Sequence, residues 1–190
     1  MYRDLLKDER FQKLLLRYDQ DLARDVQQAG CPKCSGRLDQ ANYPRKPRGD
    51  DGNSDPAIRL SLCCAVEGCR GRALPPSVRF LGRRVYLGLA FVIAGWVEQG
   101  GERCSRAQVR ERIGVSRRTL QRWRRWWTAT LPRTRLWEGE RGRFESPIAS
   151  SDLPRGLLDR FAGGPGERVM ALLWFLSPLT TTSLAGQPAF

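Results

Sequence analysis

Residues 31–38 read CPKCSGRL, and the chain returns to cysteine at residues 62–69 with LCCAVEGC. These two segments hold five of the six cysteines of a 190-residue chain that has no histidine. Two tight turns that each present a pair of thiolates supply the four ligands of a tetrahedral zinc ion. The spacing therefore predicts one Zn²⁺ held by four cysteines. Such a site is structural rather than catalytic, because it leaves no open position for water.

The first pair, Cys31 and Cys34, has the two-residue gap of a zinc knuckle, and Gly36 would let the backbone amides of the turn approach the sulfurs. A redox motif of the same spacing would stand at the end of a strand that enters a helix. The sequence CPKCSGRLDQANYP does not continue as a helix, which favours a metal site. Unliganded cysteines are the remaining alternative.

The second pair has a wider gap, and one of its members is ambiguous. Cys69 is one ligand, and either Cys63 or Cys64 is the other. Neighbouring residues of a strand point to opposite faces, so only one of these two can bind the ion. We favour Cys64, because Leu62 places an apolar strand residue two positions before it, as in many zinc ribbons. Cys63 would then be a small buried residue.

Positive charge is concentrated in the middle of the chain. Residues 1–30 are neutral (6 Lys and Arg, 6 Asp and Glu), residues 31–144 carry +14 (24 against 10), and residues 145–190 carry −1 (3 against 4), which gives the +13 of the whole chain. This distribution predicts a surface that binds a polyanion. A high-GC genome would explain the excess of arginine over lysine, but it would not explain why the positive charge is concentrated in residues 31–144.

The segment SRAQVRERIGVSRRTLQRWRRWW, residues 105–127, has the pattern of a helix-turn-helix. Its first part, 105–113, carries the apolar positions of a short helix. Gly114 permits a tight turn, Val115 would enter the core, and Ser116 is a good N-cap for a second helix. The apolar segment 85–98 would be the first of three helices.

The second helix, 116–127, has two different faces. Leu120, Trp123 and Trp127 recur on one of them, as core residues do. The other face carries arginine and glutamine, which pair with guanine and adenine in a major groove, and further arginines would meet phosphates. We expect a DNA recognition helix; a solvated basic helix and an RNA-binding helix are the alternatives. Its candidate DNA-binding residues are Arg117, Arg118, Gln121, Arg122 and Arg125.

Two other basic segments are candidates for nucleic-acid contact. PRKPRG (44–49) lies between the cysteine pairs, and PSVRFLGRR (76–84) joins the ribbon to the helices. Either is a contact segment or a solvated loop. The candidate contact residues are Arg45, Lys46, Arg48, Arg79, Arg83 and Arg84.

Hydrophobic periodicity predicts the rest of the fold. Residues 3–28 form an amphipathic helix that ends at Gly30, residues 131–150 form loops or a small hairpin, and 167–177 form an apolar helix that fails at Pro178. We expect a mostly α protein with a small β zinc ribbon and a three-helix helix-turn-helix unit. The predicted domains are an N-terminal amphipathic helix (1–30), the zinc ribbon (31–77), the helix-turn-helix unit (78–130) and a C-terminal helical region (131–190).

The chain shows no sign of a membrane or an export signal. Its longest apolar run, VYLGLAFVIAGWV, has 13 residues, whereas a membrane-spanning helix needs about 20. The segment MYRDLLKDER does not resemble a signal peptide. We expect a cytoplasmic, nucleoid-associated protein.

The runs CPKCSGRL, YPRKPRG and RLSLCCAVEGCRGRALPPSVRFLGRRVY resemble the zinc-ribbon segment of short proteins encoded with bacterial transposases and insertion sequences. The run GVSRRTLQRW resembles the helix-turn-helix of transposases and resolvases. The resemblance covers residues 31–127, and Ser35 stands where a glycine often follows the first knuckle. It implies DNA binding for a mobile genetic element. It places the metal-ligand role on Cys31, Cys34, Cys64 and Cys69.

These features favour binding without chemistry. The chain has no histidine base, no Ser-His triad and no phosphate-binding glycine-rich loop. The segments outside 31–127 also lack the pattern of a transposase catalytic domain. We therefore expect no enzyme, but a zinc-dependent protein of transposition or DNA recombination that binds double-stranded DNA. The alternative is an assembly or targeting subunit that binds a transposase or recombinase through its hydrophobic C-terminal helices, which are also a possible homodimer interface.

Overall fold

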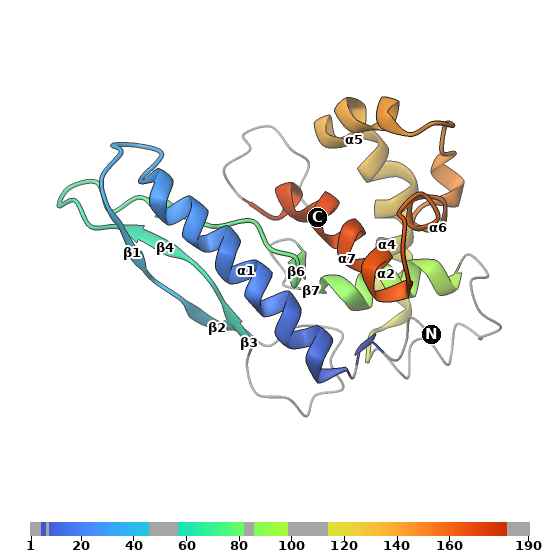
Figure 1. Ribbon diagram of the computed structural model, residues 1–190, viewed down its shortest axis with the longest axis horizontal. Helices are drawn as coiled ribbons and strands as arrows, with labels where there is room; N and C mark the ends of the chain where they lie inside the picture. The colour runs from blue at the N-terminus through green and yellow to red at the C-terminus, as the bar shows by residue number, and fades with distance from the viewer. Residues whose placement is uncertain (1–4, 7, 46–56, 82–85, 99–113, 182–190) are drawn as a thin grey trace.

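The computed structural model of the chain describes residues 5, 6, 8–45, 57–81, 86–98 and 114–181. The short strands between residues 38 and 73 gather at one end of the molecule and most helices at the other. The long helix α1 (Glu9–Ala29) runs beside the strands toward the other helices (Figure 1). Within these ranges the protein is mostly helical with a small sheet region, which confirms the predicted fold class at that level.

Helix α1 is bounded by two local signals. The carboxylate of Asp8 accepts hydrogen bonds from the backbone N–H groups of Arg10 (2.9 Å) and Phe11 (3.2 Å), which caps the N-terminus. The helix therefore begins at Glu9, later than the apolar pattern predicts. It ends at Gly30, as predicted, where a φ of 79° favours glycine.

The ribbon consists of two antiparallel pieces of sheet. In the three-stranded piece, of order β1–β4–β5, Leu38 lies opposite Cys64 and Asp39 lies opposite Cys63. One face of this piece closes a small core against Val26 of α1. The core residues are Cys31, Leu38, Leu62, Cys64 and Ala73. The strands are β1 (Leu38–Gln40), β4 (Leu62–Cys64) and β5 (Arg72–Ala73), with β2 (Tyr43–Arg45) pairing β3 (Ala57–Arg59) in the second piece.

The helical part begins with a short strand pair, β6 (Phe80–Leu81) and β7 (Tyr86–Leu87), which leads directly into α2 (Gly88–Glu98). Because the chain is paired as a strand up to residue 87, the apolar helix starts later than the predicted residue 85. Helix α4 (Arg117–Arg125) continues through a π-helical turn at 126–130 and a 3₁₀ turn at 131–133.

An aromatic cluster joins these helices. The ring of Phe91 in α2 lies 5.3 Å from that of Trp123, 5.0 Å from that of Trp126 and 4.9 Å from that of Trp127, measured between centroids. Large aromatic side chains bury much apolar area, so this contact stabilises the packing of α2 against α4 and the turn that follows it. Phe11 and Leu15 of α1 belong to the same core.

The C-terminal region differs from its prediction in one place. Residues 131–150 contain helix α5 (Arg135–Glu140) and two 3₁₀ turns, and no strand. The hydroxyl of Thr134 accepts a hydrogen bond from the backbone N–H of Trp137 (3.2 Å) and caps α5, while Trp137 is buried. The cap at Thr134 and the burial of Trp137 stabilise a helix here, although Pro132, Gly139 and Gly142 favour loops.

The apolar C-terminal helix is present, with slightly shifted ends. Helix α7 (Pro165–Leu176) stops before Pro178, and the chain continues as a 3₁₀ turn at 177–180. It is preceded by the short helix α6 (Arg155–Leu158). Buried residues of α7, among them Val169 and Leu172, lie in the core that contains Phe91. The C-terminal helices thus pack on the rest of the protein.

A buried polar joint, centred on Asp19, connects α1 to the segment that links the ribbon to the helical part. The fully buried carboxylate of Asp19 accepts hydrogen bonds from Ser77 Oγ (2.7 Å), the Val78 backbone N–H (2.7 Å) and Arg79 Nε (2.9 Å). Thr180 Oγ1 in turn accepts from the Ser77 backbone N–H (2.8 Å). Three segments distant in sequence therefore meet at one site.

Two arginines anchor this joint to the ribbon. Arg79 Nη2 donates to the Ile58 carbonyl oxygen (2.6 Å), and Arg59 Nη2 donates to the Pro75 carbonyl oxygen (2.8 Å). Arg59 is buried, and this burial lowers the pKa of its guanidinium, which the nearby Asp19 carboxylate partly offsets. The buried carboxylate of Asp19 therefore stabilises the positive charges of both Arg79 and Arg59.

Candidate metal centre

The first cysteine turn is closed by its own backbone. The Ser35 N–H donates to the Cys31 carbonyl oxygen (2.8 Å), and the Cys31 N–H donates to the Gly36 carbonyl oxygen (2.9 Å). Ser35 has a φ of 57°, in the left-handed region. This is the position where a glycine is common, and serine adopts it here with some strain.

The second turn repeats this arrangement despite its longer gap. The Cys64 N–H donates to the Gly71 carbonyl oxygen (2.8 Å), which matches the closing bond of the first turn. Arg70, which precedes Gly71 as Ser35 precedes Gly36, also has a left-handed φ, of 43°. The two extra residues are accommodated by a turn in which the Cys69 N–H donates to the Val66 carbonyl oxygen (3.2 Å).

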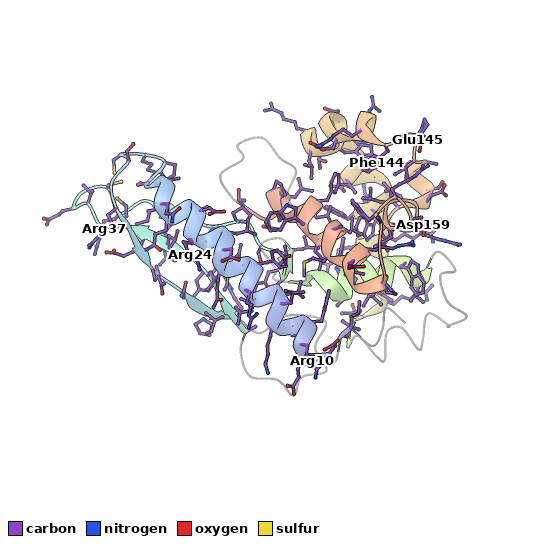
Figure 2. All side chains as sticks on the ribbon, in the orientation of Figure 1. Arg10, Arg24, Arg37, Phe144, Glu145 and Asp159 are labelled. Atoms are coloured by element: carbon purple, nitrogen blue, oxygen red, sulfur yellow. The ribbon has the colours of Figure 1, made fainter. Side chains whose placement is uncertain are left out.

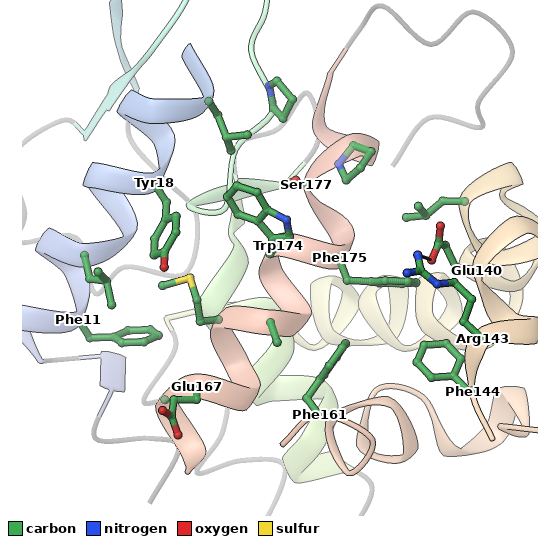
Figure 3. Close-up of a pocket in the computed structure, with 18 residues that line it drawn as sticks. Phe11, Tyr18, Glu140, Arg143, Phe144, Phe161, Glu167, Trp174, Phe175 and Ser177 are labelled. Carbon is green, nitrogen blue, oxygen red and sulfur yellow. Dashed lines mark hydrogen bonds and ion pairs between the residues drawn. The ribbon is translucent and has the colours of Figure 1, made fainter. Parts of the chain in front are cut away.

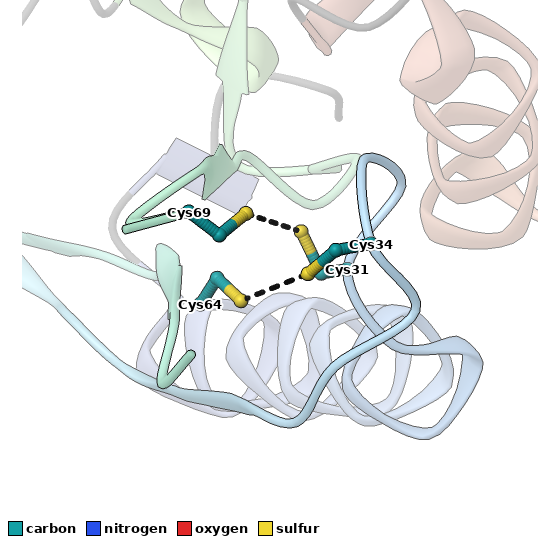
Figure 4. A group of neighbouring side chains, drawn as sticks. All are labelled: Cys31, Cys34, Cys64 and Cys69. Atoms are coloured by element: carbon teal, nitrogen blue, oxygen red, sulfur yellow. Dashed lines mark hydrogen bonds between the residues drawn. The ribbon is translucent and has the colours of Figure 1, made fainter. Parts of the chain in front are cut away.

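The two turns bring four sulfurs together (Figure 4). The Sγ atoms of Cys31, Cys34, Cys64 and Cys69 all lie within 4.8 Å of one another. Cys31 Sγ is 3.7 Å from Cys69 Sγ, and Cys34 Sγ is 3.5 Å from Cys64 Sγ. A tetrahedral zinc ion with Zn–S bonds of about 2.3 Å would separate its sulfurs by roughly 3.8 Å. The group therefore has the size of a four-thiolate metal site.

Cys63 lies outside this group because of the strand register. Cys64 is on the buried face of β4, while Cys63 lies opposite Asp39 and Arg72 on the other face. Neighbouring strand residues face opposite ways, as predicted. Cys63 is half-exposed, however, and not the buried residue that the sequence suggests.

Two glycines make room for the sulfurs. A Cβ atom on Gly36 would lie 3.3 Å from Cys34 Sγ and 3.5 Å from Cys64 Sγ, and it would collide with Val66 Cγ2. A Cβ atom on Gly71 would lie 3.4 Å from Cys31 Sγ and 3.5 Å from Cys69 Sγ. The sequence motifs predict this role for Gly36 but not for Gly71. The repeated Cys-X-Gly pattern at 34–36 and 69–71 is the signal that could have identified it.

The thiols have unequal acidity. The backbone N–H of Lys33 stabilises the Cys31 thiolate and, against the effect of burial, lowers its pKa from 9.0 to about 7. The backbone N–H of Val66 acts in the same direction on Cys64, but burial and the three neighbouring cysteines outweigh it and raise the pKa to about 12. Four adjacent thiolates need a cation between them, so the donor set fits a soft divalent ion such as Zn²⁺.

Helix α4 presents the predicted basic face to solvent. Ser116 Oγ accepts a hydrogen bond from the Thr119 N–H (3.2 Å) and caps the helix, Gly114 has a φ of 64°, and Val115 is buried. Residues 105–113, the expected partner helix, lie outside the described residues. The exposed residues of α4 are Arg117, Arg118, Gln121, Arg122, Arg124 and Arg125, whereas its inward residues are Thr119, Leu120 and Trp123.

The other basic candidates fall into three groups. Arg45 is exposed, with its guanidinium 4.9 Å from the centroid of the Tyr43 ring. Arg79, expected to contact phosphate, is instead bound by Asp19 and by the ribbon backbone, with only 13% of its side chain exposed. Its role in the structure is to hold the joint together. The remaining candidates, which lie outside the described residues, are Lys46, Arg48, Arg83 and Arg84.

A large apolar groove lies between α1, α5 and α7, with a volume of about 1170 Å³. Figure 3 shows Phe11 and Tyr18 of α1 on one side, Trp174 and Phe175 of α7 in the middle, and Phe144 on the other side. Leu14 and Trp174, which also line it, are 41% and 46% exposed. Exposed apolar surface of this kind is typical of an interaction site.

In the part of the chain that the structure describes, no helix is both long and apolar enough to cross a membrane. Compared with protein-family models, curated proteins and solved structures, the chain matches none.

Proposed function

We propose that the chain is a DNA-binding protein of a mobile genetic element, that one structural zinc ion holds its ribbon, and that α4 reads the major groove. The observation that carries the proposal is the exposed face of α4. Its long polar side chains point outward from a helix whose other face is fixed by the buried Leu120 and Trp123. A recognition helix needs this combination of a rigid back and a basic front.

The zinc ion would be held by Cys31, Cys34, Cys64 and Cys69 and would supply the tetrahedral link between the two turns. The chain's own residues then do the binding. Arg118 and Gln121, in the N-terminal part of α4, would meet base edges, and Arg122 and Arg125 would meet phosphates. The proposed activity is binding alone, with no chemical step. The mobile-element role rests on the sequence resemblance of residues 31–127.

The proposal is tested by selecting a motif from randomised duplex DNA with the zinc-loaded protein at about physiological salt, which suppresses non-specific binding. Replacing Arg118 and Gln121 by alanine should then weaken binding to that motif by at least tenfold, since each bidentate base contact contributes about 1–3 kcal/mol of discrimination. Binding to a scrambled duplex should change much less. Titrations of both duplexes measure the difference.

The matched control is Arg10→Ala, which removes the same charge from an exposed position on α1. This variant should weaken binding to both duplexes slightly and equally. If the α4 variant behaves like the Arg10 variant, or if no motif is enriched, α4 is not a recognition helix.

The apolar groove favours a second candidate function. An assembly or targeting subunit would use it to bind a transposase or recombinase, with Trp174 as the central contact. The buried Leu173 cannot serve, because it belongs to the core.

Trp174→Asp tests this second function. It should weaken binding to a purified transposase or recombinase encoded beside this chain by about 30-fold or more, as loss of an interface hot spot does. DNA affinity should stay unchanged. Calorimetry with the partner and a parallel DNA titration give the two values. An unchanged partner affinity, or no binding by the wild type, contradicts the assembly function.

A further inference from the structure

A small basic pocket lies on the ribbon, away from the cysteine cluster. It has a volume of about 290 Å³. In β5, Arg72 lies opposite Cys63 and so faces away from the sulfur of Cys64. The residues that line the pocket are Tyr43, Arg45, Ser61, Arg72 and Leu74.

Arg45 is held in place by its neighbour. Its guanidinium lies 4.9 Å from the centroid of the Tyr43 ring, a cation–π contact. Tyr43 is half-buried and lies opposite the buried Arg59 in the β2–β3 pair. A fixed tyrosine ring therefore restricts the exposed guanidinium of Arg45, which reduces the entropy that a ligand would cost it.

Among the described residues, the pocket gathers positive charge without a carboxylate partner. The described residues that line it supply two guanidinium groups, two hydroxyl groups and no carboxylate. Among the residues that the structure describes, neither Arg45 nor Arg72 takes part in an ion pair. The carboxylate of Asp39, in the neighbouring strand β1, is bound by Arg37 at 3.2 Å. Two arginines that line one concave site favour an anion between them.

We propose that this pocket binds a phosphate group, with Arg45 and Arg72 as its charged donors and Tyr43 as the residue that positions Arg45. The pocket's volume of about 290 Å³ is large enough for one phosphate group. We assign its source as a phosphodiester of duplex DNA, an assignment that rests on the proposed function. A free phosphate ion has the same chemistry, and the experiment separates the two.

The pocket itself is tested without DNA. Inorganic phosphate is titrated into the zinc-loaded, ¹⁵N-labelled full chain at constant ionic strength, and the arginine Nε–Hε resonances are followed. Those of Arg45 and Arg72 should move together and saturably. Those of Arg37 and Arg24, which lie elsewhere on the ribbon and on α1 (Figure 2), should not move. Absence of a shift at Arg45 and Arg72 overturns the phosphate site.

The source is tested with a non-specific duplex over a range of salt concentrations. The Arg45→Gln, Arg72→Gln double variant should bind about tenfold more weakly at physiological salt. Its slope of log affinity against log salt should be smaller by about 0.9, the value for one lost phosphate contact. The control double variant, Arg10→Gln with Arg24→Gln, loses the same net charge on α1, outside the pocket, and should keep the wild-type slope.

The outcomes of the two arms are distinct. A phosphate shift with an unchanged DNA slope keeps the site and overturns its assignment to DNA. A wild-type chain that binds no DNA refutes the proposed function, while the phosphate titration still decides the pocket. Thermal unfolding and zinc content of both variants, expected to equal those of the wild type, verify that the ribbon is intact.

Discussion

Replacing Cys64 by serine should release the zinc ion and unfold the ribbon, whereas the same change at Cys63 should do neither. The two residues are adjacent in β4, but Cys64 Sγ lies in the four-sulfur group and Cys63 lies opposite Asp39 on the other face. The pair is therefore a matched test of the metal site.

The expected effect is large because the ribbon has little else to stabilise it. Its own core consists of five buried residues, two of which are cysteines of the metal site. So small a core cannot offset the conformational entropy of the segment. Structural zinc contributes about 10–16 kcal/mol of apparent binding free energy in small zinc domains.

Metal content and two structural probes measure the result. Zinc should fall from one ion per chain to nearly none in Cys64→Ser and stay at one in Cys63→Ser. All six tryptophans lie outside residues 31–77, so their fluorescence reports the helical part, while amide resonances of β1 and β4 report the ribbon. Full zinc content in Cys64→Ser, or equal loss in Cys63→Ser, contradicts the ligand assignment. Chelation of the wild-type protein should reproduce the Cys64→Ser spectra.

The second large effect is expected at Asp19. Asp19→Ala should lower the free energy of unfolding of the zinc-loaded protein by about 3–5 kcal/mol, the usual result of removing one partner from a buried ion pair. The substitution leaves the guanidinium of Arg79 without its carboxylate and increases the penalty on the buried Arg59. It also removes the acceptor of Ser77 Oγ and of the Val78 N–H.

Asp21 is the matched control on the same helix. Its carboxylate pairs with Arg24 at 2.9 Å, and both side chains are mostly exposed. Such surface pairs contribute about 0–1 kcal/mol. Urea unfolding of the two alanine variants compares them directly. A loss at Asp19 no greater than that at Asp21 would show that the joint does not stabilise the fold.

The features that the sequence predicts correctly are those set by residues close together in the chain. The end of α1 at Gly30, the N-cap at Ser116 and the spacing of Cys31 and Cys34 each depend on a few neighbouring residues. The alternation of a strand is also local, and it correctly separates Cys64 from Cys63.

Contacts between distant residues explain what the sequence does not predict. The sequence predicts that Arg79 is free to contact phosphate, because its partner Asp19 is 60 positions away along the chain. Helix α5 is missed because the burial of Trp137 in a core built from other helices outweighs local turn signals. Contact between the basic face of α4 and DNA involves a second molecule, so the contacts that fold the chain do not encode it.

Helix α1 also acts as a rigid spacer. It inserts Phe11 into the helical core, is tied at Asp19, and meets the ribbon core with Val26. Its 21 residues span about 32 Å at 1.5 Å per residue. One residue inserted between Asp19 and Val26 would rotate these two residues by about 100° relative to each other. The ribbon, which is anchored both to the Asp19 joint and to Val26, could then keep only one of the two attachments. Two attachments along one helix therefore fix the ribbon relative to the helical part, so any ligand that touches both the proposed pocket and α4 must match one angle and one distance.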